Sequence, residues 1–262
     1  MRPADLPRLL ERPWQLLAAA VVLYWLTALV IGLRADIELG ARELVNVVLL
    51  GPLSLLLAYR ISERIAGAAL GAWTLLVWVA LPWLAPLFTL SSYDATLRDL
   101  ILPLSVGLTQ DGGYVEGVAL LAALALLLAR RPPTVAAGAL ILAALGAVWL
   151  SRLPVPDLSV DAFKANMASL REYFWSHRVM QWIPIAGVVA IAQRSPPAAL
   201  AIGSWLGAYV LFRAAQPAIE VENGDFFRAL LPAFPPYVLL AASLPLLVPT
   251  LAARLGPLAR PA

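Results

Sequence analysis

The densest mixture of reactive side chains lies near the end of the chain, in segment 220–228. It carries three carboxylates, an amide, two phenylalanines and an arginine, and it runs straight into the apolar, proline-broken stretch 230–237. Charged groups beside a hydrophobic span are costly to keep without partners, so such a cluster is a functional-site candidate. The alternative is a helix start, with Asp225 as its cap after an Asn-Gly turn. The candidate substrate- or phosphate-binding residues here are Glu222, Asn223, Asp225 and Arg228.

A second group of acids follows the first long apolar stretch. Asp36 and Glu38 stand two residues apart, and Arg42 and Glu43 follow one turn later. A carboxylate at a membrane surface can act as a general base toward a hydroxyl group, because a low-dielectric setting raises its basicity. We name Asp36 and Glu38 as candidate catalytic residues and expect Arg42 and Glu43 to pair with one another. The alternative is a solvated loop with local ion pairs.

Two further segments place an arginine where it can meet phosphate. Asp94 and Arg98 stand four residues apart, so on a helix they pair, unless the planar fork of Arg98 holds a phosphate instead. Arg171 precedes the lone His177, which lacks the spaced partners of a metal site. We expect a membrane-interface anchor there, with lipid phosphate on Arg171 as the alternative. Asp94, Arg98 and Arg171 thus join the phosphate-binding candidates.

Composition defines the setting of these residues. Of the 262 residues, 61% are hydrophobic and 13% are charged, whereas charged residues make up about a quarter of a soluble domain. The chain is therefore predicted to be an all-α, polytopic transmembrane helical bundle forming one domain over 1–262. A net charge of +3 without a basic block argues against a nucleic-acid partner, and the absence of cysteine excludes thiolate chemistry.

Apolar stretches of about 20 residues predict about eight spans. The first is too long and too aromatic for a signal peptide, so we expect a retained helix. The expected spans cover residues 14–33, 44–59, 65–86, 114–128, 134–150, 179–193, 198–212 and 237–254.

Segment 157–176 has a different pattern. Phe163, Met167 and Leu170 recur at helical spacing, while Lys164 and Asn166 take the other side. This predicts an external amphipathic helix that lies on the membrane interface.

The charges indicate which loops are external. Three arginines before residue 13 hold the start of the chain in the cytoplasm, so alternation places both termini there. Only Asp5, Glu11 and Glu63 of the 16 acids then fall inside, which puts any chemistry on the external face. We expect span interiors free of ionisable side chains, which disfavours a coupled transporter. The chain also lacks a phosphate-cradling glycine motif, a nucleophile elbow and a zinc signature.

Three segments resemble one family. The stretch 226–240, with its Leu-Pro-Ala-Phe-Pro-Pro-Tyr-Val-Leu-Leu run, resembles the C-terminal core segment of GT-C-type membrane glycosyltransferases. The stretch 57–72, with Pro82 closing the next span, looks like the inner turn and third helix of that family. Tyr93-Asp94 leading to 102–108 is similar to the segment that follows. The chain would be a short and divergent member.

The resemblance implies an activity in the cell envelope. Such enzymes move a sugar from a polyprenyl-phosphate carrier to an acceptor on the external face, with an acidic residue of the first external loop as base. The matching position is Asp36, with Glu38 as its competitor, and the carrier phosphate would lie near Arg98 and Arg228. We expect an integral protein of a bacterial plasma membrane that binds lipid and a polyprenyl-phosphate-linked sugar. No cofactor is indicated, and a divalent cation is left open.

Two alternatives stand beside this expectation. One is a non-catalytic relative that binds the lipid carrier or a partner membrane protein. The other is an uncoupled flippase or transporter, which would need a polar path across the bilayer.

Overall fold

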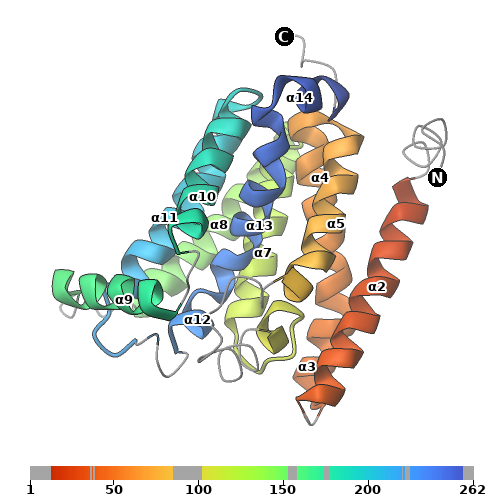
Figure 1. The fold of residues 1–262 in the computed structure, drawn as a ribbon. Coiled ribbons are helices and arrows are strands. Elements are labelled where there is room, and N and C mark those ends of the chain that lie inside the picture. Colours follow the sequence, from red (N-terminus) through yellow and green to blue (C-terminus); the bar gives the residue numbers. More distant parts are fainter. Residues whose placement is uncertain are drawn as a thin grey trace.

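The described part of the chain is helical wherever it is regular (Figure 1). The computed structural model describes residues 13–35, 37, 39–84, 102–152, 158–173, 177–219, 221 and 225–255. No strand occurs among these residues, so the prediction of an all-α chain is confirmed.

The helix boundaries follow the start and stop signals of the sequence. Helices α8, α11 and α13 begin at Pro-Pro pairs, which fit a first turn because its N–H groups need no helical acceptor. Gly67 separates α4 from α5 at a φ of 97°. The elements are α2 (Pro13–Arg34), α3 (Ala41–Val45), the π-helix η1 (Asn46–Leu50), α4 (Gly51–Ala66), α5 (Ala68–Leu84), α7 (Gly113–Leu127), α8 (Pro132–Arg152), α9 (Val160–Tyr173), α10 (His177–Ala192), α11 (Pro196–Ala214), α12 (Asp225–Ala229), η4 (Leu231–Ala233), α13 (Phe234–Ser243), η5 (Leu244–Leu247) and α14 (Pro249–Leu255).

Four helical segments are long and apolar enough to cross a membrane by length and composition. They are Pro13–Arg34, Ala41–Ala66, Pro132–Trp149 and Pro196–Ala214. Four shorter apolar helical segments, Ala68–Trp83, Gly113–Leu127, Gln181–Ala192 and Leu231–Leu247, overlap the other four predicted spans. The apolar helices of a membrane protein are thus present at the predicted places.

The connections gather at the two ends of the bundle. Helix α14 and the α10–α11 turn lie at one end, which we call the α14 end, and α3, α9 and α12 lie at the opposite end, the α12 end (Figure 1). A hydrogen bond from Arg194 to the Ala252 carbonyl (3.2 Å) ties the α10–α11 turn to α14. At the α12 end, Arg42 donates to the Gln110 carbonyl (2.9 Å). Loops that the sequence assigns to one side therefore share one end.

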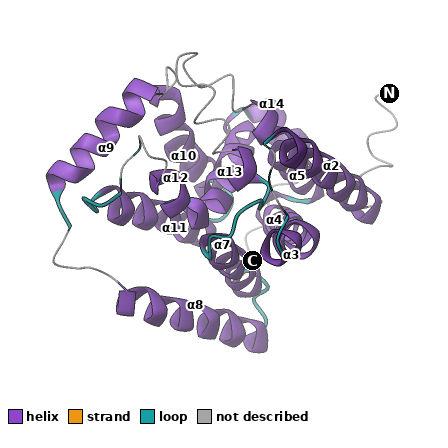
Figure 2. Cartoon of the chain, turned by 90° about the horizontal axis from the view of Figure 1, so that it is seen from below, coloured by secondary structure: helices purple, strands orange, loops and turns teal. Residues whose placement is uncertain are grey.

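Helix α13 is the centre of the bundle. It packs against α10, α5, α11, α4 and α7, and Figure 2 shows it enclosed by them in a view along the bundle. Val238, Leu239 and Leu240 are buried. Packing between apolar helices relies on close approach, and Gly187 of α10 provides it, since a Cβ there would lie 2.5 Å from the Leu240 carbonyl oxygen.

Helix α9 lies across the α12 end (Figure 1), and one of its polar residues is placed differently from the prediction. Its apolar residues pack on a small cluster around Ala214 and Phe226, so the chain itself covers them. Asn166, expected on the polar side, is buried and donates to the carbonyls of Ala214 (2.9 Å) and Ile219 (2.8 Å). The reason is that the carbonyls at the end of α11 need donors, which a short amide side chain supplies.

Replacement of Asn166 tests this anchor. Asn166→Ala leaves the buried Ala214 carbonyl and the partly buried Ile219 carbonyl without this donor, so the free energy of unfolding should fall by about 2 kcal/mol. Denaturant unfolding of the protein in detergent micelles measures the loss. The matched control is Lys164→Ala, an exposed change on the same helix. Equal stability of the two variants would show that α9 is held by other contacts.

Candidate functional site

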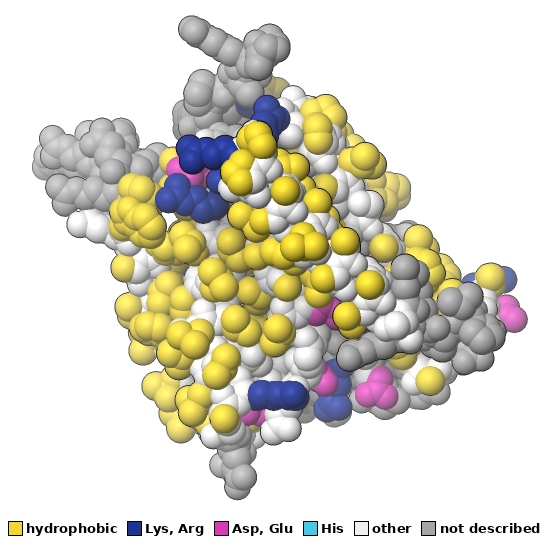
Figure 3. All heavy atoms as spheres, turned by 180° about the vertical axis from the view of Figure 1, so that it is seen from behind, with side chains coloured by type: hydrophobic (Ala, Val, Ile, Leu, Met, Phe, Trp, Pro, Cys, Tyr) yellow, Lys and Arg dark blue, Asp and Glu magenta, His cyan; other side chains and the backbone are white. Residues whose placement is uncertain are grey.

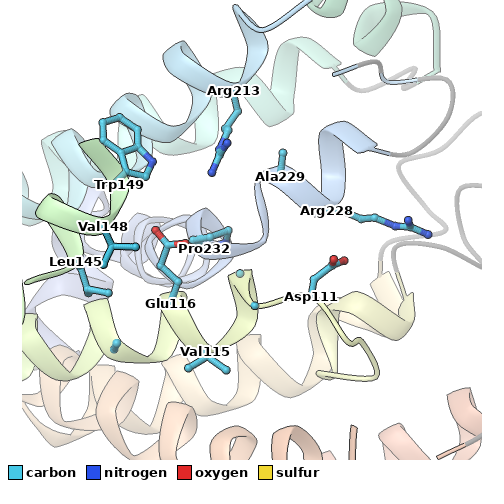
Figure 4. A pocket seen from close by; sticks show the side chains of 13 residues that line it. Asp111, Val115, Glu116, Leu145, Val148, Trp149, Arg213, Arg228, Ala229 and Pro232 are labelled. Atoms are coloured by element: carbon cyan, nitrogen blue, oxygen red, sulfur yellow. The ribbon is translucent and has the colours of Figure 1, made fainter. Parts of the chain in front are cut away.

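A cavity opens at the α12 end between α7, α8, α11 and α12 (Figure 4). Its volume is about 490 Å³, within the roughly 300–1,000 Å³ usual for small-molecule sites. The lining residues are Asp111, Gly112, Gly113, Val115, Glu116, Ala119, Leu145, Val148, Trp149, Arg213, Arg228, Ala229 and Pro232.

Two carboxylates and two guanidinium groups give this cavity its chemistry. In Figure 4, Glu116 and Arg213 extend toward one another from opposite walls, whereas the end of Arg228 points away to one side. In the described residues, the one ion pair within 4.0 Å is Arg60–Glu63, which lies elsewhere. Among the described residues, the charged groups of the cavity therefore form no ion pair with one another.

Glu116 sits in the first turn of α7, where a negative charge is favoured by the helix dipole. The Tyr209 hydroxyl on α11 donates a hydrogen bond to its carboxylate. Glu116 lies inside the predicted span 114–128, so the expectation of span interiors without ionisable groups is wrong at this position. An acid in an apolar helix is maintained because a partner from a neighbouring helix satisfies it.

Arg213 ends α11 with unused hydrogen-bonding capacity. Its Nη1 donates to the Gln216 side-chain oxygen (3.3 Å), while its buried Nε has no partner. An unsatisfied donor in a protein interior is unusual and requires an explanation, such as a ligand. The planar guanidinium presents parallel donors that suit a carboxylate or a phosphate.

An aromatic group closes the wall between α8 and α11. The Trp149 ring lies 5.0 Å from the Phe212 ring in an edge-to-face arrangement and 6.1 Å from the Tyr209 ring. These contacts hold the end of α8 against α11. Trp149 also contacts Tyr209, whose hydroxyl bonds Glu116. The three aromatic rings therefore place the Glu116 carboxylate beside the apolar face of Trp149.

The connection before α7 positions Asp111. The Tyr24 hydroxyl donates to the Val106 carbonyl (2.7 Å), and the Asn46 amide donates to the Thr109 carbonyl (2.8 Å). Asp111 is then held by Thr109, whose hydroxyl accepts from the Asp111 N–H (3.1 Å) and donates to its carboxylate (3.2 Å).

A positive backbone angle makes this connection compact. Gly107 has a φ of 77°, and a Cβ there would approach the Tyr114 ring to 3.0 Å. The apolar run 101–108 is too short to cross a membrane, and its sequence predicts an interfacial or re-entrant segment. Its described residues form one helical turn at 102–105 and a turn at 106–107, and residues 103–108 are buried. The run thus packs against the bundle of this chain.

The predicted site residues are divided between described and undescribed positions. Asp36, Glu38, Asp94, Arg98, Glu222 and Asn223 lie outside the described residues. Of the others, Arg228 lines the cavity, Asp225 begins α12 without lining it, and Arg171 is exposed on α9. The cavity therefore includes one of the predicted phosphate ligands.

The expected pair of Arg42 and Glu43 does not form. Arg42 bonds the Gln110 carbonyl, and Glu43 is 4% exposed with Oε2 lacking a partner. Adjacent residues on a helix point in different directions, so they are poorly placed to meet.

Four polar or aromatic side chains of the cavity lining were not among the predicted site residues: Asp111, Glu116, Trp149 and Arg213. The signal for Glu116 was an acid two residues into an apolar span, which is a functional hypothesis by default. No three-ligand cluster of His, Asp or Glu able to hold a metal ion occurs in the described parts of the chain. Comparison with protein-family models, curated proteins and solved structures finds no significant match to this chain.

Removal of the Tyr209 hydroxyl tests whether it supports Glu116. Tyr209→Phe should lower the free energy of unfolding by about 1–3 kcal/mol, because the Glu116 side chain loses a hydrogen-bond donor in a partly buried site. In a Glu116→Gln background the same change should cost less, giving a measurable coupling in a double-mutant cycle.

Tyr237→Phe is the control for losing a hydroxyl, since Tyr237 is partly buried and makes no hydrogen bond in the described structure. If the losses in unfolding free energy of Tyr209→Phe and Glu116→Gln were additive, the two side chains would not be energetically coupled.

Proposed function

We propose that this chain is a GT-C-like membrane glycosyltransferase that moves a sugar from a polyprenyl-phosphate carrier to an acceptor at the external membrane face. The observation that carries the proposal is the cavity at the α12 end. It combines a guanidinium with an unused buried donor, two carboxylates and a tryptophan at the rim of an apolar helix bundle. The resemblance of stretch 226–240 to GT-C enzymes supports the same reaction class.

Arg213 and Arg228 are the proposed phosphate ligands. A carrier phosphate gains negative charge as the sugar leaves it, and preorganised positive donors stabilise that charge most in the transition state. Trp149 offers an apolar ring beside which a sugar can lie. Both arginines line the same cavity. Arg213 extends into it, whereas the end of Arg228 must turn inward from α12 to reach the same phosphate.

The wall formed by α8 suits the lipid part of such a carrier. Leu145 and Val148 contribute apolar surface to the cavity, and only 6% of the apolar window Pro132–Trp149 is buried within this chain. Figure 2 shows α8 at the edge of the bundle, beside α7. A polyprenyl chain can therefore lie along α8 while its phosphate enters the cavity.

In the proposed reaction, the acceptor hydroxyl oxygen bonds to the anomeric carbon as the bond from that carbon to the phosphate oxygen breaks. A carboxylate takes the hydroxyl proton, and polyprenyl phosphate leaves. The resemblance assigns this base to Asp36 or Glu38. Asp111 is the cavity carboxylate that can share or replace this role, because it lies on the connection before α7 and is held in the described structure by the small hydroxyl of Thr109 alone, whereas Glu116 is bonded to a side chain of another helix.

A second candidate is a non-catalytic protein that binds the carrier. It is favoured by one observation: both cavity carboxylates are bonded inside the chain, Asp111 to Thr109 and Glu116 to Tyr209. Carboxylates held in this way also fit a purely structural role. This candidate predicts carrier binding without sugar transfer.

The proposed topology has eight spans, the α12 end outside and both termini in the cytoplasm of a bacterium. The chain has no cysteine, so single cysteines can be introduced cleanly. Ser151→Cys, exposed at the end of α8, should react with a membrane-impermeant maleimide on intact cells. Arg131→Cys, exposed in the α7–α8 turn, should react only after permeabilisation. The reverse pattern would place the cavity on the cytoplasmic side.

Binding and transfer are tested separately. Arg213→Gln should weaken binding of polyprenyl phosphate, measured by native mass spectrometry in detergent, by about tenfold to a hundredfold, the value of a charge-assisted hydrogen bond. The control is Arg34→Gln, an exposed arginine at the end of α2 that does not line the cavity. Equal affinities of the two variants would reject the phosphate site.

Transfer is read from the glycolipid profile of a deletion strain complemented with each variant. Asp36→Ala/Glu38→Ala and Asp111→Asn should reduce the glycosylated product while carrier binding persists. An unchanged profile for all acid variants, with binding intact, would favour the non-catalytic carrier-binding protein.

A further inference from the structure

A second cavity lies at the α14 end, far from the proposed catalytic site. Its volume is about 270 Å³, and it is formed by the ends of α4, α7 and α10 with the start of α11. The lining residues are Arg64, Ile65, Leu128, Arg130, Arg194 and Ser195.

This cavity carries three guanidinium groups and no carboxylate in its lining. The acid nearest in sequence, Glu63, is engaged in a 2.9 Å ion pair with Arg60, one turn earlier on α4. Three positive charges around one small volume repel each other unless an anion lies between them. The charge balance of the cavity therefore calls for a negative occupant.

Two of the arginines are held in place by the backbone. Arg64 donates through Nη1 to the Ala125 carbonyl near the end of α7, and Arg194 donates through Nη2 to the Ala252 carbonyl of α14 (3.2 Å). The second terminal nitrogen of Arg194, Nη1, is buried and has no partner. The backbone bonds fix these guanidinium groups in position while leaving donor capacity for a ligand.

Arg130 is in an unusual backbone conformation. Its φ is 54°, and it is the one non-glycine residue with positive φ in the described chain. Glycine is the usual residue at such a position after a helix end, because a Cβ is disfavoured there. The Arg130 side chain is exposed and forms no hydrogen bond or ion pair with the described residues, so its guanidinium is available to a ligand that enters the cavity. The positive φ of Arg130 is explained if its side chain serves a ligand.

Helix ends offer a simpler account of part of this cluster. Arginines are favoured at helix C-termini, where they bond free carbonyls and interact well with the helix dipole. That account explains Arg64 and one nitrogen of Arg194. It leaves the free nitrogen of Arg194 and the conformation of Arg130 unexplained.

We propose that the cavity at the α14 end binds a phosphate group through Arg64, Arg130 and Arg194. Guanidinium groups match phosphate oxygens in geometry and charge, and basic pockets between membrane helices bind lipid headgroups. Figure 3 shows Lys and Arg side chains gathered at this end, directly above a broad hydrophobic surface. The phosphate belongs to the headgroup of an anionic phospholipid or to a small soluble phosphate.

Ligand-dependent stabilisation of the whole protein in detergent tests the proposal. The probes are short-chain phosphatidylglycerol, short-chain phosphatidylcholine and inorganic phosphate, each titrated while the Tm is followed. Phosphatidylglycerol should raise the Tm saturably, and Arg130→Gln should weaken its apparent affinity by about tenfold or more. Arg131→Gln, an exposed arginine outside the cavity, is the matched control and should change the affinity less than twofold.

Arg130→Gly separates ligand binding from folding. Glycine removes the backbone strain, so the Tm without ligand should rise while the response to the ligand is lost. A response to phosphatidylglycerol alone identifies a lipid headgroup, and a saturable response to inorganic phosphate that Arg130→Gln abolishes identifies a soluble phosphate. The proposal is overturned if Arg130→Gln and Arg131→Gln behave alike, or if no probe raises the Tm.

Discussion

The hydroxyl of Tyr24 is the constraint on which the α12 end depends. It donates to the Val106 carbonyl and lies 3.0 Å from the Tyr114 hydroxyl, so it connects α2, the connection before α7, and α7 itself. A polar group buried in an apolar bundle is costly unless it is bonded, which makes this arrangement highly specific. Gly51 of α4 leaves room for it, since a Cβ there would lie 2.3 Å from the Tyr24 ring. These contacts of the Tyr24 hydroxyl fix the start of α7 and hence the direction in which Glu116 leaves that helix.

Helix positions could be read from the sequence because apolar runs, Pro-Pro starts and the break at Gly67 are local signals. The turns that carry Arg64, Arg130 and Arg194 lie at one end of the bundle. This grouping follows from the sequence because successive spans cross the bundle in alternating directions. The lengths of the spans were less predictable. Several helices are shorter than the roughly 20 residues that a membrane-spanning helix needs. In the last apolar stretch, the prolines of the first turn of α13 and the 3₁₀ turns η4 and η5 divide the helix into short pieces.

The site was harder to predict because it depends on contacts between distant segments. Arg228 was identified from its own neighbourhood, whereas Glu116 becomes meaningful only when Tyr209, 93 residues away, is seen to bond it. Asn166 shows the same limit. Its place on a helical wheel indicated an exposed face, but the free carbonyls at the end of α11 determine its environment. Pairing by adjacency, as for Arg42 and Glu43, ignores the direction in which helical side chains leave the backbone.

Helix α8 has a consequence for how such a protein can diversify. It rests mainly on α7 and touches α11 through Trp149, while much of its remaining surface is exposed. Substitutions at Leu145 or Val148 can therefore reshape one wall of the cavity without disturbing the packed centre around α13. The chain thus separates a packed scaffold around α13 from a more exposed cavity wall on α8. Lineages descended from it could change the size of this cavity by altering a single helix, at little risk to folding.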